Sequence, residues 1–172
     1  MIDILKRLEH EGYQFEVADA SLELLLRGAA GWTQPFFELE SFRVSTQRWG
    51  SGARAWNDMT AEVDTEATVK VKVGDERIVS IGEGNGPVNA LHAALGQAIG
   101  VRYPAFADIA LTDFKVRVLD SSAGTAAVTR VLIDLSNGSQ QWTTIGVSDN
   151  VVEASWQALV DGIVFGLLHA DS

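Results

Sequence analysis

A stretch that occurs twice decides the fold of this chain. "IGEGNGPVNALHAAL" runs from Ile81 to Leu95, and "IGVSDNVVEASWQAL" runs from Ile145 to Leu159, 64 residues later and without a gap. The two stretches share the opening Ile-Gly pair and several apolar positions of the segment that follows. A gapless echo of this length predicts a duplicated structural unit.

The residues around the first copy predict three strands and a helix. "FFELESFRVSTQ" (36–47) is rich in aromatic and β-branched residues, and "ATVKVKV" (67–73) alternates valine with lysine, which is typical of a half-buried strand. "GDER" (74–77) predicts a turn and "IVSIG" (78–82) the returning strand. "PVNALHAALGQAIG" (87–100) then predicts an amphipathic helix, whose apolar stripe is Val88, Leu91, Leu95 and Ile99.

The same order follows Pro104. "LTDFKVRVLD" (111–120) sets three apolar residues against Lys115 and Arg117; the three are Phe114, Val116 and Val118. "AAVTRVLIDL" (126–135) and "QWTTIGVS" (141–148) predict two further strands around the turn "SNGSQ" (136–140), and the chain closes with a helix.

The predicted fold is therefore α+β, with two pseudo-repeated βββα units at about 32–101 and 108–170. In each unit a helix packs on one face of an antiparallel sheet. One such unit buries its apolar faces poorly alone, so we expect two units, or two chains, to pack together. A helical linker segment (1–31) precedes this 32–172 domain; Asp19 is expected to cap its second helix. "RWGSGARAWNDM" (48–59) is expected to be a mobile loop.

Composition excludes several classes of protein. The chain has 172 residues, a net charge of −10 and no cysteine. Such acidity argues against binding to nucleic acid or to anionic membranes, and the missing cysteines exclude disulfides and thiolate sites. No apolar stretch approaches the roughly 20 residues of a membrane span, and no signal peptide is apparent. We expect a soluble cytoplasmic protein.

The two predicted helices begin differently. The second copy starts with Asn150, a good N-cap, and Glu153 completes a capping-box pattern. In the first copy Gly86, Pro87 and Asn89 stand at the equivalent start, which leaves backbone N–H donors at the positive end of the helix dipole. This arrangement is typical of an anion site, and a single carboxylate fits it better than a phosphate. Taken alone, the spacing of the glycines favours a simple conformational role at a turn before the helix.

Three motifs resemble one known family. "EGNGPVNALHAAL", "LTDFKVRVLDSSAGTAAVTRVLI" and "IGVSDNVVEASWQALVDGI" together resemble the C-terminal regulatory (dimerisation) domain of the 2-isopropylmalate synthases, closest to the citramalate synthase branch. "EGYQFEVADASLELLLR" looks like the linker before that domain. The resemblance implies a homodimer that binds a branched-chain amino acid, isoleucine or leucine, as a feedback inhibitor.

The resemblance also implies which residues surround the effector. The loop and helix start would be Gly84, Asn85, Gly86, Pro87, Val88 and Asn89, and the apolar wall would be Phe114, Val118 and Ala126. The family often has tyrosine where Phe114 stands, and phenylalanine keeps the apolar wall without the hydroxyl. Asp120 is a candidate partner for the ammonium group, with the start of a turn as its ordinary role.

The chain itself carries no recognisable catalytic constellation. His10, His92 and His169 are isolated, and Asp64 and Glu66 are expected to be solvated in a region leading from a loop into a strand. The family's divalent metal and acetyl-CoA would belong to an absent catalytic barrel domain, which would be a further partner. A ligand-free structural dimerisation module is the alternative function, and an independent enzyme is disfavoured. The five tryptophans are expected in the core or at the dimer interface.

Overall fold

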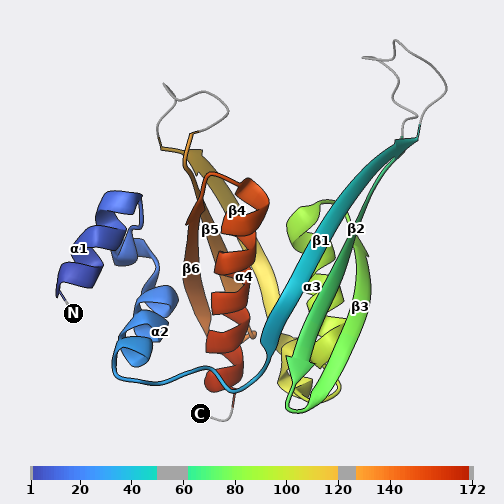
Figure 1. Cartoon of the computed structure of the whole chain (residues 1–172), viewed down its shortest axis with the longest axis horizontal. Helices are drawn as coiled ribbons and strands as arrows, with labels where there is room; N and C mark the ends of the chain where they lie inside the picture. The colour runs from blue at the N-terminus through green and yellow to red at the C-terminus, as the bar shows by residue number, and fades with distance from the viewer. Residues whose placement is uncertain (1, 50–61, 120–126, 171–172) are drawn as a thin grey trace. The chain divides into compact units, whose positions relative to one another are not determined.

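The computed structural model describes residues 2–49, 62–119 and 127–170. They form two compact units, residues 37–102 and residues 1–36 together with 103–172. Each unit contains a three-stranded antiparallel sheet followed by a helix, which confirms the predicted α+β class and the βββα units (Figure 1). The helical segment belongs to the same compact unit as the second sheet. The domain boundary predicted at residue 31 stays a prediction.

The first βββα unit comprises β1 (Glu38–Trp49), β2 (Glu62–Val73), β3 (Glu76–Gly84) and α3 (Pro87–Ile99), with strand order β1-β2-β3. The predicted valine alternation is confirmed, since Val69, Val71 and Val73 are buried on the face that α3 covers. The predicted turn connects β2 to β3, and Gly74 adopts a φ of 62° there. The apolar stripe of α3 is confirmed at Leu91, Leu95 and Ile99, together with three buried alanines.

The second βββα unit comprises β4 (Ala110–Val118), β5 (Thr129–Ser136), β6 (Gln141–Ser148) and α4 (Val151–Leu168), with order β4-β5-β6. The short helix η2 (Pro104–Asp108) leads into β4. Val131, Ile133 and Leu135 of β5 are fully buried on the side of α4.

Strand register shows the duplication directly. Val69 pairs with Phe42 in the first unit, and Ile133, 64 residues after Val69, pairs with Phe114 in the second. Even the irregularities match, because the register shifts between Leu39 and Ser41 in β1 and between the corresponding residues 111 and 113 in β4. Phe42 and Phe114 are 72 residues apart, so the connection before the second strand is eight residues longer in the first unit.

Gly82 and Gly146 explain why the echo begins with Ile-Gly. A Cβ on Gly82 would meet the backbone of Ala90 and Ala94, and a Cβ on Gly146 would meet that of Ala154 and Ala158. Glycine on the strand therefore lets each helix approach its sheet closely, and the small alanines on the helix serve the same end.

The N-terminal segment packs on the second sheet. It forms α1 (Ile2–Glu11), η1 (Phe15–Val17) and α2 (Asp19–Ala29). Phe15, Ala18 and Ile145 make its buried contact with the sheet, and Leu132 and Val147 pack around them. The face of this sheet opposite α4 is thus covered by the helical segment over β5 and β6 (Figure 1).

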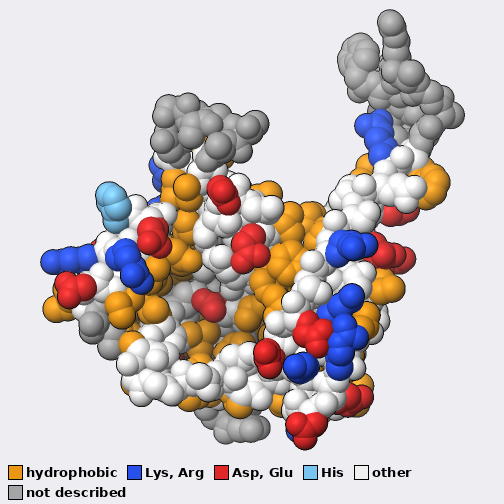
Figure 2. All heavy atoms as spheres, viewed as in Figure 1, with side chains coloured by type: hydrophobic (Ala, Val, Ile, Leu, Met, Phe, Trp, Pro, Cys, Tyr) orange, Lys and Arg blue, Asp and Glu red, His pale blue; other side chains and the backbone are white. Residues whose placement is uncertain are grey.

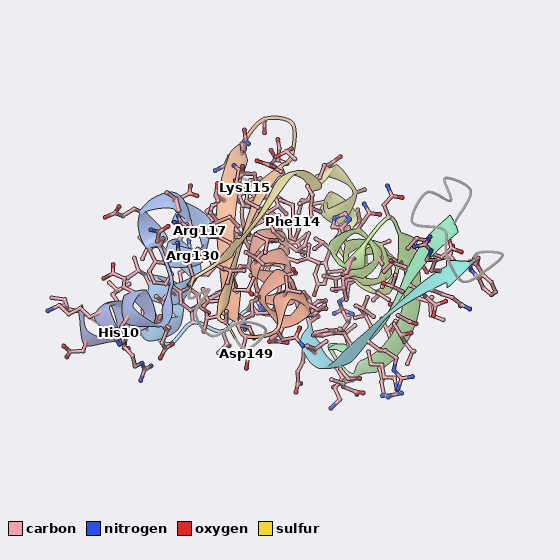
Figure 3. All side chains as sticks on the ribbon, turned by 90° about the horizontal axis from the view of Figure 1, so that it is seen from above. His10, Phe114, Lys115, Arg117, Arg130 and Asp149 are labelled. Carbon is pink, nitrogen blue, oxygen red and sulfur yellow. The ribbon has the colours of Figure 1, made fainter. Side chains whose placement is uncertain are left out.

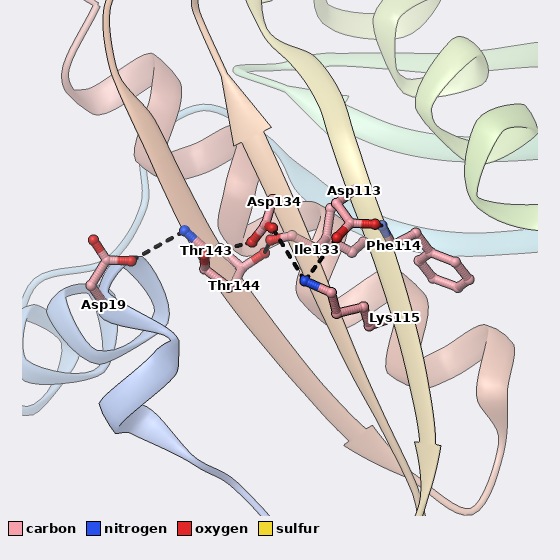
Figure 4. A network of polar contacts seen from close by, with 8 residues as sticks. All are labelled: Asp19, Asp113, Phe114, Lys115, Ile133, Asp134, Thr143 and Thr144. Carbon is pink, nitrogen blue, oxygen red and sulfur yellow. Dashed lines mark hydrogen bonds and ion pairs between the residues drawn. The ribbon is translucent and has the colours of Figure 1, made fainter.

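Asp19 does not cap α2 as predicted. The N-cap is Ala18, and Asp19 occupies the first helical position. Its carboxylate instead accepts a hydrogen bond of 3.1 Å from the backbone N–H of Thr143 in β6. This hydrogen bond holds the start of α2 against β6. Figure 4 shows this contact beside the network in which Asp134 accepts from the Thr143 hydroxyl and pairs with Lys115.

Other expectations need correction. Helix α4 spans 18 residues with mean hydropathy 1.5, which is long and apolar enough for a membrane span, but 61% of it is buried inside the structure as a core helix. Asp64 and Glu66 are exposed as expected, and they lie near the start of β2. Trp142 and Trp156 are core residues as expected, whereas Trp49 is 55% exposed at the end of β1. Residues 50–59 of the expected mobile loop, and Asp120, lie outside the described residues.

Candidate functional site

The loop between β3 and α3 has an uncapped helix start. Gly86 is the N-cap of α3 in an extended conformation, no side chain accepts a hydrogen bond there, and Pro87 takes the first helical position. A Cβ on Gly86 would meet nothing within 4 Å, so neither its conformation nor close packing requires glycine. Helix α3 thus begins without a side-chain cap, as the sequence predicted.

Gly84 has a different role from Gly86. A Cβ on Gly84 would meet the side chain of Asn89 and the backbone of Ala90. Gly84 is thus required for the close approach of β3 to the first turn of α3. Of the two glycines, only Gly86 leaves room for a ligand.

Helix α4 provides the contrast. The Asn150 side chain accepts hydrogen bonds from the N–H groups of Val152 (2.9 Å) and Glu153 (3.2 Å), which confirms the predicted cap. The reciprocal half of the predicted capping box is not formed, because the Asn150 N–H donates to Ser148 and the Glu153 carboxylate accepts from Gln157. Even so, a side chain accepts from the first N–H groups of α4, whereas no side chain caps those of α3.

A hollow of about 650 Å³ opens beside the α3 start. Its lining combines three kinds of group from the first unit: Gly84, Asn85 and Asn89 of the loop; the acids Asp64, Glu66 and Glu83; and Trp49 and Val63 among neighbouring strand residues. Glu66 and Glu83 lie directly opposite each other in the β2–β3 pair. Like charges in that position repel each other, so the hollow favours a cationic group near them.

The lining of the hollow therefore contains the three kinds of group that an amino acid needs. Backbone N–H groups at a helix start bind a carboxylate, carboxylates bind an ammonium group, and half-exposed Trp49 and Val63 offer apolar surface.

Comparison with known proteins identifies the domain. Residues 16–167 match the model of the LeuA allosteric (dimerisation) domain. The chain belongs to this family. The match covers nearly all of the residues that the structure describes, and we call the chain a LeuA-type domain.

The relatives of this LeuA-type domain are longer synthases. The chain is 50% identical over 163 residues to an (R)-citramalate synthase of Synechocystis sp., covering 95% of the chain and 29% of that protein. It is 46% identical over 171 residues to an (R)-citramalate synthase of Streptomyces coelicolor, covering 99% and 30%. A 2-isopropylmalate synthase of Geobacillus sp. is 31% identical over 134 residues, covering 78% and 22%. The LeuA-type domain thus spans about 30% of the length of the citramalate synthases that it matches.

The structure groups only part of the predicted effector residues. Gly84, Asn85 and Asn89 line the hollow, and Gly86, Pro87 and Val88 form the helix start beside it. Phe114 and Val118 belong to the other compact unit, where they are 43% and 52% exposed on β4. Phe114 points away from the β4 face that carries Lys115 (Figures 3 and 4). Ala126 lies outside the described residues.

Sequence reasoning overlooked the acids and the apolar residues of the hollow. A countable signal existed, because the turn at 74–75 pairs Val73 with Glu76 and therefore places Glu66 opposite Glu83. Trp49 and Val63 had no such signal, since the long connection between β1 and β2 conceals their register.

The most perturbed carboxyl group lies elsewhere. Burial raises the pKa of Asp161 on α4 to about 6, although a hydrogen bond of 2.6 Å from the Ser21 hydroxyl opposes the shift. Asp161 lines a cavity of about 460 Å³ beneath α1 and α2, whose other lining residues are mostly apolar. Among residues 2–49, 62–119 and 127–170, no three His, Asp or Glu side chains are grouped to hold a metal ion.

Proposed function

We propose that this LeuA-type domain is the regulatory part of a cytoplasmic citramalate synthase or 2-isopropylmalate synthase. In this function it self-associates as a homodimer and binds a branched-chain amino acid for feedback inhibition. Isoleucine is the first candidate, because several of the relatives are citramalate synthases, and leucine is the second. The divalent metal and acetyl-CoA would bind to the catalytic barrel domain.

The observation that carries the proposal is the difference between the two helix starts. α4 is capped by Asn150, whereas α3 begins at an uncapped Gly86 beside a hollow with acids and apolar side chains. The effector carboxylate would face the α3 N–H groups, its ammonium group the acids, and its side chain Trp49 and Val63. Phe114, Val118 and Ala126 stay proposed members of the apolar wall.

Inhibition requires that the effector bind one state of the full enzyme more tightly than another. A coupling free energy of roughly 1–3 kcal/mol is typical and corresponds to a change in affinity of about 5- to 150-fold.

The test is isothermal titration of the chain with isoleucine, leucine and valine in parallel, repeated with Gly86→Asn and Gly86→Asp. Asparagine gives α3 the cap that α4 has, and the open space around Gly86 accommodates it. We expect saturable binding of one amino acid, lost in both variants while thermal stability is kept or raised. Asn150→Gly, at the equivalent position of α4, is the matched control and should keep the binding.

The acids provide a second readout. Glu66→Gln should weaken binding about tenfold, since a charge-assisted hydrogen bond to the ammonium group is lost. Glu76→Gln, at the far end of β3, should not change it. If none of the three amino acids bound at millimolar concentration, the ligand-free dimerisation module would replace this proposal.

A further inference from the structure

The outer edge of β6 is protected by side chains. Thr143, Ile145 and Val147 direct their backbone N–H groups away from β5. Their acceptors are the Asp19 carboxylate, the Ser21 hydroxyl and the Gln157 amide oxygen, each at 3.1 Å. An edge strand with satisfied N–H groups cannot accept a further strand.

The equivalent edge of β3 has no such protection. Because β2–β3 and β5–β6 share their register, Val79, Ile81 and Glu83 stand where Thr143, Ile145 and Val147 stand in β6. In the described part of the chain no side chain accepts from their outward N–H groups. Ala93 of α3 occupies the position of Gln157 and is too short to reach.

Burial follows the same pattern. Ile145 is 1% exposed under the helical segment, whereas Ile81, at the same repeat position, is 49% exposed. Val79 is also half-exposed. Alternating apolar side chains on an unprotected edge indicate a strand that accepts another strand.

The other two sheet edges are less suitable. β1 and β4 each carry a register shift near their start, a device that disrupts pairing at sheet edges. β3 pairs with β2 without any shift from Glu76 to Gly84. Among the edges that the structure describes, β3 is the continuous and unprotected one.

We propose that β3 pairs antiparallel with β3 of a second copy of this chain, about a two-fold axis at Ser80. This inference deepens the proposed self-association, on which it rests, and the interface needs no effector to form. The two three-stranded sheets would join into one continuous six-stranded sheet. Such an interface is isologous, because each copy contributes the same strand.

The sequence of β3 is complementary to itself in this register. With Ser80 on the axis, Arg77 lies opposite the partner's Glu83, and Val79 lies opposite the partner's Ile81. Both pairs join residues whose N–H groups point outward, as the hydrogen-bonded pairs of an antiparallel ladder require. Each dimer would gain two Arg–Glu pairs and two apolar pairs on the face opposite α3.

The pairing also offsets a repulsion between two carboxylates of the same chain. Glu66 and Glu83 lie opposite each other with no oppositely charged partner among the described residues. The partner's Arg77 would pair with Glu83 and offset this repulsion, which leaves Glu66 for the effector's ammonium group. Arg77 contacts Glu40 through its Nε at 2.7 Å, and a guanidinium has further donors for a second carboxylate.

Charge reversal with rescue tests this register. Arg77→Glu and Glu83→Arg each place like charges opposite each other, so each should raise the dimer dissociation constant about 100-fold in sedimentation equilibrium without ligand. The double variant restores both pairs and should return to within about tenfold of the unaltered chain. Lys70→Glu, on β2 and on the same face, is the matched control and should leave the constant unchanged.

A cross-link provides a second measurement, since the chain contains no cysteine. Ser80 meets its own copy in a non-hydrogen-bonded pair, where Cα atoms lie about 4.5 Å apart, within the range of a disulfide. Ser80→Cys should therefore oxidise to a covalent dimer, and Ser45→Cys on β1 should not.

The outcomes separate the two proposals. A chain that stays monomeric at all concentrations would overturn both the self-association and the β3 interface. A dimer that both single reversals leave intact, or that the double variant fails to restore, would overturn the β3 pairing alone. A dimer in which Ser80→Cys forms no cross-link would overturn the register centred on Ser80.

Discussion

The two βββα units have the same interior and different surroundings. Their strand register, their bulges and the glycines under their helices match position by position. The sheet face opposite the helix differs: Ile145 is buried beneath the N-terminal helices, while Ile81 is half-exposed. Figure 2 shows basic and acidic side chains interspersed over part of the first unit. Duplication thus preserved the packing between helix and sheet and let the outer surfaces diverge.

The helix starts diverge in the same sense. Asn150 closes the start of α4, and Gly86 leaves that of α3 open. In the second unit, side chains accept from the N–H groups at the start of α4 and along the outer edge of β6. In the described part of the first unit, the N–H groups at the start of α3 and along the outer edge of β3 have no such side-chain acceptors. An internal repeat therefore supplies a built-in control for deciding which features packing requires and which are available for binding.

The largest expected contrast is at the two matching isoleucines. Ile145→Ala should lower the free energy of unfolding by about 3–4 kcal/mol, because it opens a cavity in a packed site. Ile81→Ala should lower it by less than about 1 kcal/mol in the monomer, because the side chain is already half in water. Urea denaturation at low protein concentration measures both values. Equal losses would contradict the difference in burial.

The two strand glycines should behave alike. Gly146→Ala and Gly82→Ala each push a Cβ into the helix backbone, so each should cost about 2–3 kcal/mol of stability. Gly28→Ala in α2 is the control, because its Cβ would meet nothing within 4 Å and alanine favours a helix. Thermal unfolding of the three variants checks this, and a large loss in only one repeat would show that the close packing differs between the units.

The buried carboxyl of the second unit should make stability depend on pH. Its pKa of about 6 in the folded chain lies above the ordinary 3.8, so the folded state holds the proton more tightly. The stabilisation from Asp161 is present below about pH 4 and is lost as pH rises through 6. Because this carboxyl lines an open cavity, we expect an effect of about 1–2 kcal/mol.

Asp161→Asn keeps the shape of the side chain and should flatten this part of the pH profile. The matching position of α3 is Gln97, so Gln97→Glu serves as the control and should leave the profile nearly unchanged at this exposed site. Stability curves between pH 4 and 8 measure both, and an unaltered profile for Asp161→Asn would assign the dependence to another group.

The smallest contrast is at the helix caps. Asn150→Ala should cost about 1 kcal/mol, since two N–H groups lose their acceptor, and Gly86→Asn should gain a few tenths. Chemical denaturation resolves the first value, and a shift of the thermal midpoint shows the sign of the second. A loss for Gly86→Asn would show that the space before α3 is closed in solution.

Much of the fold could be predicted because its signals are local. The valines of 67–73 alternate along one strand, and the glycine turn at 74–75 fixes the next strand, so β2, β3 and α3 follow from neighbours in the sequence. The uncapped start at Gly86 was predictable for the same reason. Asp19 was misjudged because a carboxylate at a helix start can serve its own helix or a distant strand, and only the contact with Thr143 decides between them.

The sequence by itself determined that this chain is a duplicated βββα protein with one open and one closed helix start, because period, turns and caps act over a few residues. The tertiary structure alone decided that the N-terminal helices cover the second sheet. It also decided that Glu66 and Glu83 share a hollow with Trp49. Side chains accept from the outward N–H groups of β6, and none of the described side chains does so for β3. These features depend on segments far apart in the chain, for which local periodicity carries no information.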